Sequence, residues 1–420
     1  MSKVTGAPTG PPGFPPFQPS HAELSALSLT IRASITEYET AKTAQEKTAA
    51  LQKIQATSTK LSRVTTSIQQ QFMQLNFGPN VNVAIRIGVE MGLFTALLKS
   101  GEPSTVRDLA RETNSQKEFL FRIARTLSVF DILQESDSSP SELPCYSHTS
   151  YSRFLSLPPA EASTRHTFDN MLHAQVNSAN RYYTKNGFKN PEDAKNSPFS
   201  FANGKENMGI FDILEEQPER MKVFNSAMAV HSTIGLKDII KSYPFDNLEP
   251  NNDGVVLVDV GGGKGHVINE IRTVYPQIKG SMVLEDMQVV LDGGTVVPED
   301  VTKQSYDFFK QQQPIEGSNY FLKSIIHDWP DASCIQILGN LASAMRSSPS
   351  SRLLICELVL PDRNPTIGHV LRDMNMLVIA GKERNKLQWK KLLGEAGYKI
   401  LGYHGERNAD SSIIEAVLDE

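Results

Sequence analysis

The fold of this chain is decided by the stretch Leu257-Val258-Asp259-Val260-Gly261-Gly262-Gly263-Lys264-Gly265-His266. The apolar run 255–260 predicts a parallel strand that is buried on both faces. Four glycines within the next five positions let a ligand approach the backbone closely. The segment 267–273 predicts a helix, whose free N–H groups at its start can bind that ligand. A strand, a glycine-rich turn and a helix in this order are typical of a nucleotide or nucleoside site.

The spacing of the glycines narrows the choice of ligand. A dinucleotide fold has Gly-x-Gly-x-x-Gly, but here His266 occupies the third glycine position. A P-loop ends in Gly-Lys-Ser/Thr, but here Gly265 follows Lys264. Asp259, at the end of the strand, disfavours a pyrophosphate and favours a cationic ligand. The predicted cofactor is therefore S-adenosylmethionine, which carries an ammonium and a sulfonium but no phosphate.

A second pair of acids ends the next predicted strand, residues 280–286. An acid roughly 20–30 residues after the glycines, at the tip of the second strand, accepts hydrogen bonds from the ribose hydroxyls of a bound nucleoside. We expect Asp286 to have this role, with Glu285 as the alternative.

The composition is that of a globular protein with room for two domains. The chain has 420 residues, of which 39% are hydrophobic and 21% are charged. We expect neither a membrane span nor a signal peptide, because no apolar run is long enough and the N-terminus lacks an apolar core. Three scattered cysteines, Cys145, Cys334 and Cys356, predict reduced thiols and a cytoplasmic location. No Cys/His spacing suggests a metal site, and the net charge of −5 gives no reason to expect nucleic acid.

Composition shifts along the chain predict three parts. Residues 1–19 are rich in Pro and Gly, which predicts a flexible lead. Residues 20–245 carry apolar positions at helical spacing and predict a helical dimerisation and substrate-lid domain. A link rich in Pro, Asn and Asp at 243–253 precedes residues 246–420, where strands and helices alternate as in a doubly wound sheet.

The helical part begins with Ser20-x-x-Glu23, which predicts a capping box. Apolar spacing then predicts one helix over 24–35 and another over 61–75, which either pack on their own domain or form an arm that clasps a second subunit. Residues 80–155 resemble a winged helix, with short helices and then an extended stretch over 145–154. A winged helix could bind DNA, but the acidic chain favours dimerisation or a lid.

A second group of candidate catalytic residues lies in the C-terminal half of the chain. His327 and Asp328 follow the apolar run 320–326, at the carboxyl edge where open α/β sheets place ligands. A histidine there can act as a general base near neutral pH, although a structural role is the alternative. Glu357 lies inside an apolar run, which is unfavourable unless the carboxylate has a partner. With Glu383 it would hold the histidine in one tautomer.

From about Asn76 to Glu420, the chain resembles the S-adenosylmethionine-dependent O-methyltransferases that act on plant and fungal small molecules. The resemblance rests on Val-Asp-Val-Gly-Gly-Gly-Lys-Gly (258–265), Asp-Phe-Phe (307–309), His-Asp-Trp-Pro-Asp (327–331), Glu-Leu-Val-Leu-Pro (357–361), Gly-Lys-Glu-Arg (381–384) and Gln-Trp-Lys-Lys-Leu-Leu (388–393). It implies a homodimer with an N-terminal winged-helix dimerisation region and a C-terminal Rossmann-like methyltransferase domain of the α/β class.

The resemblance also implies roles for individual residues. It predicts a cofactor site formed by Asp259, Gly261, Gly263, Asp286, Asp307, Phe308 and Lys323. It predicts His327 as the base, Glu357 and Glu383 as the residues that orient it, and no metal. The residues themselves suggest a substrate pocket of His148, Met171, Met228, His231, Thr233 and Asp328, although methionines at helical spacing usually pack in a core. The implied reaction is in-line methyl transfer to a phenol or enol hydroxyl of a small secondary metabolite.

A rival reading concerns the same fold. Some fungal proteins of this family bind the cofactor yet transfer no methyl, and catalyse dehydration or pericyclic ring-forming steps such as cycloaddition or Alder-ene reactions. Lys323, His148, His231 or Thr233 could hydrogen-bond a substrate carbonyl and lower such a barrier. A non-catalytic dimer is a third reading, which the presence of the His and both Glu residues disfavours.

Overall fold

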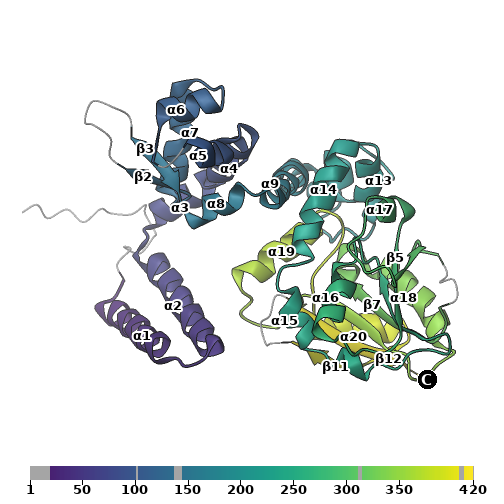
Figure 1. Ribbon diagram of the computed structural model, residues 1–420. Helices are drawn as coiled ribbons and strands as arrows, with labels where there is room; N and C mark the ends of the chain where they lie inside the picture. The colour runs from purple at the N-terminus through teal and green to yellow at the C-terminus, as the bar shows by residue number, and fades with distance from the viewer. Residues whose placement is uncertain (1–18, 101–102, 137–143, 311–314, 406–410, 420) are drawn as a thin grey trace, which may run out of the picture. The chain divides into compact units, whose positions relative to one another are not determined.

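The computed structural model describes residues 19–100, 103–136, 144–310, 315–405 and 411–419 (Figure 1). The chain forms two compact units, of which the first is Met1–Ile87 with Phe121–Asp131. The second is Gly88–Leu120 with Ile132–Glu420. The predicted flexible lead, apart from Pro19, lies outside the described residues.

The first unit opens with two helices, α1 (His21–Thr40) and α2 (Ala44–Thr65), that pack side by side as a hairpin (Figure 1). The Ser20 hydroxyl accepts the N–H of Glu23 at 3.1 Å and caps α1 as predicted. The single helix predicted over 61–75 is wrong. Ser67 caps a new helix, α3 (Ile68–Phe77), because its hydroxyl accepts the N–H of Gln70 and its backbone is extended.

Short helices and a small sheet follow along the chain. The helices are α4 (Pro79–Glu90), α5 (Leu93–Ser100), α6 (Val106–Glu112), α7 (Lys117–Val129) and α8 (Ser150–Leu155). The strands β1 (Ser104–Thr105), β2 (Leu133–Ser136) and β3 (Cys145–His148) pair antiparallel in the order β1-β3-β2. The extended stretch predicted over 145–154 is wrong after His148, because Thr149 caps α8. Among the described helices none alone could cross a membrane, although the bent pair Ile68–Glu90 and Leu93–Ser100 has the length and composition together.

The helical segment before the large sheet contains one widened turn. Its elements are α9 (Pro158–Arg165), η1 (His166–Leu172), α10 (His173–Ser178), α11 (Arg181–Lys185), η2 (Ala194–Asn196), α12 (Pro198–Ala202), α13 (Ile210–Glu215), α14 (Pro218–His231) and α15 (Leu236–Lys241). η1 is a π-helix, a rare geometry that often occurs at functional sites. Met171 and Phe199 pack here against Val378 and Ile379 near α19 (Ile367–Leu377).

The second unit is built around a seven-stranded sheet in the order β11-β12-β8-β7-β4-β5-β6. The strands are β4 (Val255–Val260), β5 (Ser281–Asp286), β6 (Thr302–Ser305), β7 (Asn319–Lys323), β8 (Leu353–Glu357), β11 (Tyr398–His404) and β12 (Ser412–Leu418). β4 to β8 are parallel, and β12 runs antiparallel to both of its neighbours. The strand predicted over 320–326 ends at Lys323, because Ser324 has a φ of 56° and a 3₁₀ turn, η4 (Ile326–Asp328), follows.

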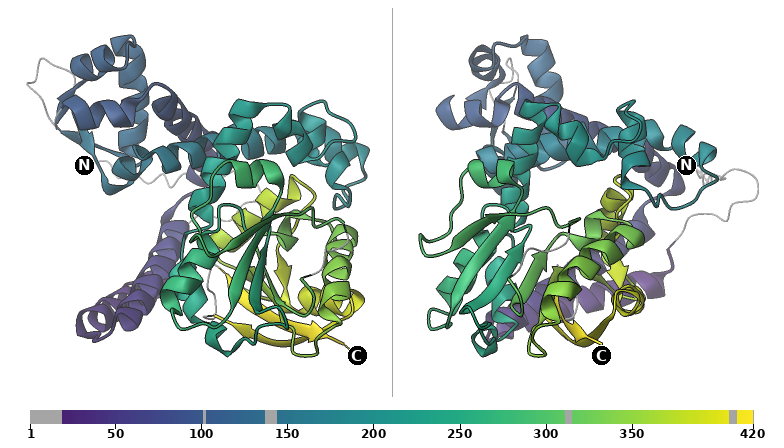
Figure 2. Two further views of the ribbon diagram at one scale, coloured as in Figure 1. Left: turned by 45° about the vertical axis from the view of Figure 1, so that its right-hand side comes forward. Right: turned by 90° about the vertical axis from the view of Figure 1, so that its right-hand side faces the viewer.

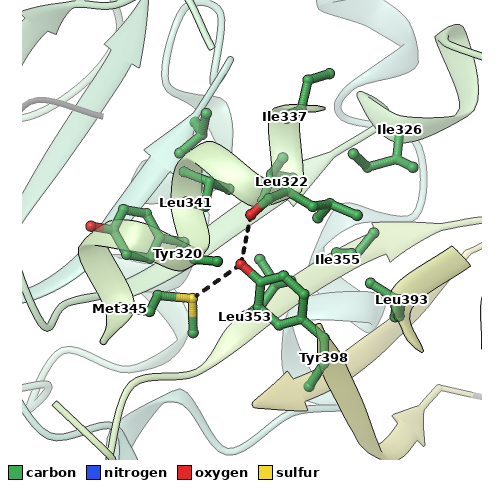
Figure 3. Packing of buried hydrophobic residues seen from close by; sticks show 14 of the residues in the cluster. Tyr320, Leu322, Ile326, Ile337, Leu341, Met345, Leu353, Ile355, Leu393 and Tyr398 are labelled. Atoms are coloured by element: carbon green, nitrogen blue, oxygen red, sulfur yellow. Dashed lines mark hydrogen bonds between the residues drawn. The ribbon is translucent and has the colours of Figure 1, made fainter. Parts of the chain in front are cut away.

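Helices cover both faces of this sheet (Figure 2). Alternate side chains of each strand point to opposite faces: Val258 and Tyr320 pack under α18 (Asp331–Met345) and α20 (Lys386–Glu395), while Leu257 and Phe321 pack under α15 and α16 (His266–Val274). Figure 3 shows the first face, where the Tyr398 hydroxyl donates to the Leu338 carbonyl at 2.9 Å. The carboxyl edge of the sheet is therefore held on a core that is close-packed on both sides. The remaining elements are η3 (Phe245–Asn247), α17 (Gln288–Asp292), β9 (Val359–Leu360) and β10 (Arg384–Asn385).

Candidate active site

The glycine turn leaves β4 and is tied to the tip of β5. The N–H groups of Gly261 and Gly262 both donate to the Glu285 carbonyl, at 2.8 and 3.1 Å. Gly263 donates to Asp286 Oδ2 at 2.8 Å, and Met287 donates to Asp286 Oδ1 at 2.7 Å. Asp286 is therefore fixed beside the turn.

Neighbouring side chains explain why this turn has no side chains of its own. A Cβ at Gly262 would lie 2.4 Å from Asp259 Oδ2, and a Cβ at Gly261 would lie 2.7 Å from Ile325 Cδ1. Gly261 and Gly263 have φ values of 69° and 61°, a region that side chains rarely adopt. No atom lies within 4 Å of a Cβ built on Gly263, so the backbone there faces open space. A ligand can approach the turn at that point.

Asp259 lies beneath the turn as a buried acid. Asp259 is 1% exposed, and neither of its carboxylate oxygens has a hydrogen-bond partner among the described residues. Burial and the charge of Asp286 raise the pKa of Asp259 to about 7, while Lys323 opposes the shift. A cation with N–H donors would stabilise the ionised form, whereas a pyrophosphate would be repelled. The unpartnered carboxylate of Asp259 therefore fits the positively charged ammonium and sulfonium of S-adenosylmethionine.

Three further predicted cofactor residues lie at this edge. The Phe308 ring is 3.7 Å from the Cβ position of Gly261. Asp307 Oδ1 accepts the N–H of Phe309 at 3.0 Å, and its other oxygen pairs with Lys310. Lys323 ends β7, where its charge acts on Asp259. The alternative to Asp286, Glu285, is fully buried and accepts from Gln304 Nε2 at 3.2 Å, so it does not lie open at the strand tip.

The turn that carries His327 is held by a carboxylate from the neighbouring strand. Glu357 Oε1 accepts the N–H groups of Ile325, Ile326 and His327 at 3.0, 2.9 and 3.3 Å. Three backbone donors to one oxygen explain how a 1% exposed acid is tolerated at the end of an apolar strand. Because Ile325 also packs on Gly261, this turn lies directly against the glycine turn.

The His327 ring is surrounded by three carboxylates. Nδ1 lies 3.0 Å from Glu383 Oε1 and 3.5 Å from Glu357 Oε2, and Nε2 lies 3.5 Å from Asp328 Oδ1. Burial alone would lower the pKa of His327, but Glu357, Asp328 and Glu383 together outweigh it and raise the pKa to about 10. The proton on Nδ1 is held by the glutamates, which leaves Nε2 as the nitrogen able to exchange a proton with a ligand.

The acids around His327 are themselves shifted. Burial raises the pKa of Glu357 to about 7 against the opposing charge of His327. Burial likewise raises the pKa of Asp328 to about 6, again opposed by His327. The group therefore shares protons among several sites near neutral pH, which suits acid–base chemistry.

Sequence reasoning gave no role to Arg384, although it ends the quoted Gly-Lys-Glu-Arg motif. The fully buried guanidinium donates to the carbonyls of Ile326 and Trp329, at 3.1 and 3.0 Å, and to Asp331 at 2.8 Å. Gly381 was also missed: a Cβ there would lie 2.2 Å from the His327 carbonyl. Arg384 and Gly381 thus both fix the position of the turn that carries His327. The one signal in the sequence was the presence of a basic residue inside the Gly-Lys-Glu-Arg motif.

The three catalytic candidates also have the spacing of metal ligands. Ligand atoms of His327, Glu357 and Glu383 lie within 4.8 Å of one another. However, Nδ1 already bonds Glu383, and Glu357 Oε1 already accepts three N–H groups. The absence of a metal remains a prediction. Glu383 also lines a cavity of about 400 Å³ together with Asp373 and Lys382.

The predicted substrate residues are not all brought together. His231 Nε2 lies 2.9 Å from Ser163 Oγ. Burial lowers the pKa of His231, and the charges of Arg372 and Lys323 lower it further. Because Lys323 ends β7, His231 is close enough to the carboxyl edge of the sheet to feel its charge. Met228 is half-buried on the same helix, and Thr233 follows it, donating to the Val230 carbonyl. Met171 is 3% exposed and packs in a core cluster that includes Phe211 and Phe224. His148 lies in β3 of the small sheet, where its Nδ1 is 2.9 Å from Ser152 Oγ.

A doubly wound sheet with a bare glycine turn and an acid at the tip of the next strand is the architecture of a Rossmann-like nucleoside-binding domain. Residues 186–399 match the family model of the O-methyltransferase domain, and residues 73–157 match that of the O-methyltransferase dimerisation domain. The chain belongs to the O-methyltransferase family. The predicted resemblance, the fold class and S-adenosylmethionine as cofactor are thereby confirmed.

Fungal relatives cover most of the chain. It is 30% identical over 345 residues to O-methyltransferase afvC of Aspergillus flavus, which covers 79% of this chain and 81% of that protein. It is 31% identical to O-methyltransferase kntB of Aspergillus niger, with 80% of each chain covered.

Solved structures share the fold at lower identity. OxaC has a TM-score of 0.83 at 21% identity, over 94% of this chain and 98% of that chain. A protein described as a pericyclic reaction enzyme has a TM-score of 0.80 at 22% identity, over 95% of this chain and 100% of that one. At these identities the likeness establishes the fold alone.

Proposed function

We propose that this protein transfers a methyl group from S-adenosylmethionine to a hydroxyl of a small secondary metabolite, with His327 as the base. One observation carries the proposal: Ile325, two residues before His327, packs on Gly261 of the glycine turn. The base and the cofactor turn are therefore neighbours. The fungal O-methyltransferase relatives support methyl transfer to an oxygen.

On the cofactor side, Asp259 binds the cationic end of S-adenosylmethionine, and Asp286 accepts hydrogen bonds from its ribose hydroxyls. Asp307 and Phe308 contact its adenine. When bound, S-adenosylmethionine supplies a methyl group already activated by positively charged sulfur. The chain's own residues then have to orient the acceptor and remove one proton.

On the acceptor side, His327 Nε2 takes the hydroxyl proton. Glu383 and Glu357 stabilise the resulting imidazolium through Nδ1. A base with a pKa of about 10 matches the proton affinity of a phenolate, so the transfer is close to thermoneutral. Glu383, which accepts the hydrogen bond from Nδ1, is then the nearest group able to take up the imidazolium proton.

The pH dependence of methyl transfer should follow the state of His327. Because the carboxylates raise its pKa to about 10, the neutral base accumulates as the pH rises, and the rate should increase from pH 7 to pH 9. Glu383→Gln keeps an acceptor for Nδ1 but removes a charge, so the pKa of His327 falls and the rising limb moves to lower pH. Initial rates with labelled cofactor from pH 6 to 10 measure this.

Glu395→Gln, an exposed acid at the end of α20, is the matched control and should leave the profile unchanged. A profile that stays in place in Glu383→Gln, or moves to higher pH, contradicts the proposed control of the base by this acid.

A second candidate function is favoured by the same raised pKa. At neutral pH His327 is largely an imidazolium, which can donate a hydrogen bond to a substrate carbonyl and lower the barrier of a pericyclic or dehydration step. Incubation with methyl-labelled S-adenosylmethionine and a panel of phenols and enols separates the two functions. Label in the product supports transfer, whereas conversion of substrate without label supports the second function.

We also propose that the protein is a homodimer in the cytoplasm. The dimerisation-domain match begins within α3, whose side chains include Phe72, Leu75 and Phe77 at 62%, 78% and 56% exposure. Covering this apolar surface in a second subunit would stabilise the dimer. Phe72→Glu with Leu75→Glu should shift the mass measured by light scattering from dimer to monomer at micromolar concentration. Leu387→Glu, equally exposed on α20, should remain dimeric; a dimer in both variants would rule out this surface.

A further inference from the structure

His166 is a buried histidine that the proposed chemistry does not use. It is 6% exposed and is the first residue of the π-helix η1. Its Nδ1 lies 2.9 Å from Asn170 Nδ2. Its ring meets Phe224 edge-on at 5.2 Å.

The partners of Asn170 settle which nitrogen of His166 carries hydrogen. Asn170 Oδ1 accepts from Arg220 Nε at 2.8 Å and also from Arg220 Nη2. With the oxygen turned to the guanidinium, the amide NH₂ faces His166 and donates to Nδ1. Nδ1 is then an acceptor, so a neutral ring has its hydrogen on Nε2.

The surroundings keep this ring neutral. Burial lowers the pKa of His166 to about 4, and the charges of His231 and Arg220 act in the same direction. The ring is thus a neutral donor throughout the physiological range, in contrast to His327.

The donor nitrogen of His166 is not fully enclosed. Within the described residues, Nε2 forms no hydrogen bond, and unlike Nε2 of His266 it is not among the fully enclosed atoms that lack a partner. A polar N–H on a nearly buried ring, with neither a protein partner nor complete enclosure, is available to a ligand.

A continuous row of aromatic rings joins His166 to the reaction edge. Phe224 contacts Phe211 at 5.7 Å, and Phe211 stacks on Trp329 at 5.9 Å. Trp329, two residues after His327, contacts Phe308 at 6.1 Å. Aromatic rings of this kind offer flat apolar surface on which a planar conjugated ligand can stack.

We propose that His166 is a specificity residue that donates its Nε2–H to a carbonyl oxygen of a planar aromatic substrate, remote from the hydroxyl that reacts at His327. This inference rests on the proposed function, because it takes the His327 edge as the place of reaction. The carbonyl and the reacting hydroxyl lie at opposite ends of the aromatic row.

The test uses two rigid planar probes that differ in the carbonyl, 2-hydroxyfluoren-9-one and 2-hydroxyfluorene. Their dissociation constants are measured by calorimetry on the full-length protein with S-adenosylhomocysteine present. The wild type should bind the ketone about 3–10-fold more tightly, which is the range for one neutral hydrogen bond. His166→Phe should remove this preference, and His166→Gln, which keeps an N–H donor, should restore part of it.

His173→Phe is the matched control, because His173 is exposed and lies on α10, directly after η1. It should keep the preference for the ketone. Thermal melting curves identify any variant that fails to fold. If His166→Phe does not fold, the wild type is compared with His166→Gln instead. Equal binding of both probes by the wild type, no binding of either, or a preference that survives His166→Phe would overturn the proposal. Since binding is read without methyl transfer, a failure of the proposed reaction gives a different result: normal binding with no label transferred.

Discussion

Replacing His327 with alanine should lower the rate of methyl transfer by about 10²–10⁴-fold, the usual contribution of a positioned base. Affinity for S-adenosylmethionine should stay nearly unchanged, because the proposed cofactor contacts come from the glycine turn, Asp259 and Asp286. Single-turnover rates with labelled cofactor measure the first effect, and calorimetry measures the second.

The matched control is His404→Ala. His404 also pairs with a glutamate, Glu415, at 3.0 Å, but it lies in β11. Its loss should leave the rate within a factor of a few of the wild type. Equal rates in wild type and His327→Ala would rule out His327 as the base.

Replacing Asp259 with asparagine should have two opposite effects. At pH 8 the affinity for S-adenosylmethionine should fall by about 10–100-fold, since a hydrogen bond to a charged group contributes about 1.5–3 kcal/mol. The ligand-free protein should become more stable, because the variant no longer buries a carboxylate that lacks a hydrogen bond among the described residues. Calorimetry and thermal unfolding measure the two effects.

The sign of the stability effect follows from the raised pKa. Because the pKa of Asp259 is about 7 when folded, ionisation opposes folding, and this opposition grows as pH rises from about 4 to 7. At 1.36 kcal/mol per unit, the gain from asparagine is at most about 4 kcal/mol at pH 8 and vanishes near pH 4. Asp253→Asn, on the exposed link before β4, should change neither quantity. A variant that is less stable at pH 8, or that binds the cofactor normally, contradicts the assigned role.

The sheet was largely predictable from sequence, because strands buried on both faces are continuous apolar runs. The runs over 255–260 and 280–286 are both strands within one residue of the expected bounds. The break after Lys323 was not predictable, because nothing in the sequence requires Ser324 to take a positive φ. The break before α3 had a local signal that was overlooked, the capping pair Ser67 and Gln70.

The residues of the candidate site could be predicted from sequence only where few residue types can perform the chemistry. His327, Glu357 and Glu383 stand out because a histidine and buried acids near sheet edges have few structural uses. Arg384 acts through carbonyls up to 58 positions away along the chain, a relation with no local pattern. His166 and Asn170 are four residues apart within a π-helix, and sequence spacing does not signal that geometry.

Both the N–H groups and the carbonyls of the turn that carries His327 are held by the protein. Glu357 accepts from the N–H groups, and Arg384 donates to the carbonyls. Gly381 packs closely against the His327 carbonyl. The geometry of this turn is thus independent of whichever acceptor enters. Under the proposed function, substitutions in the helices that surround the acceptor would change substrate preference without moving the base.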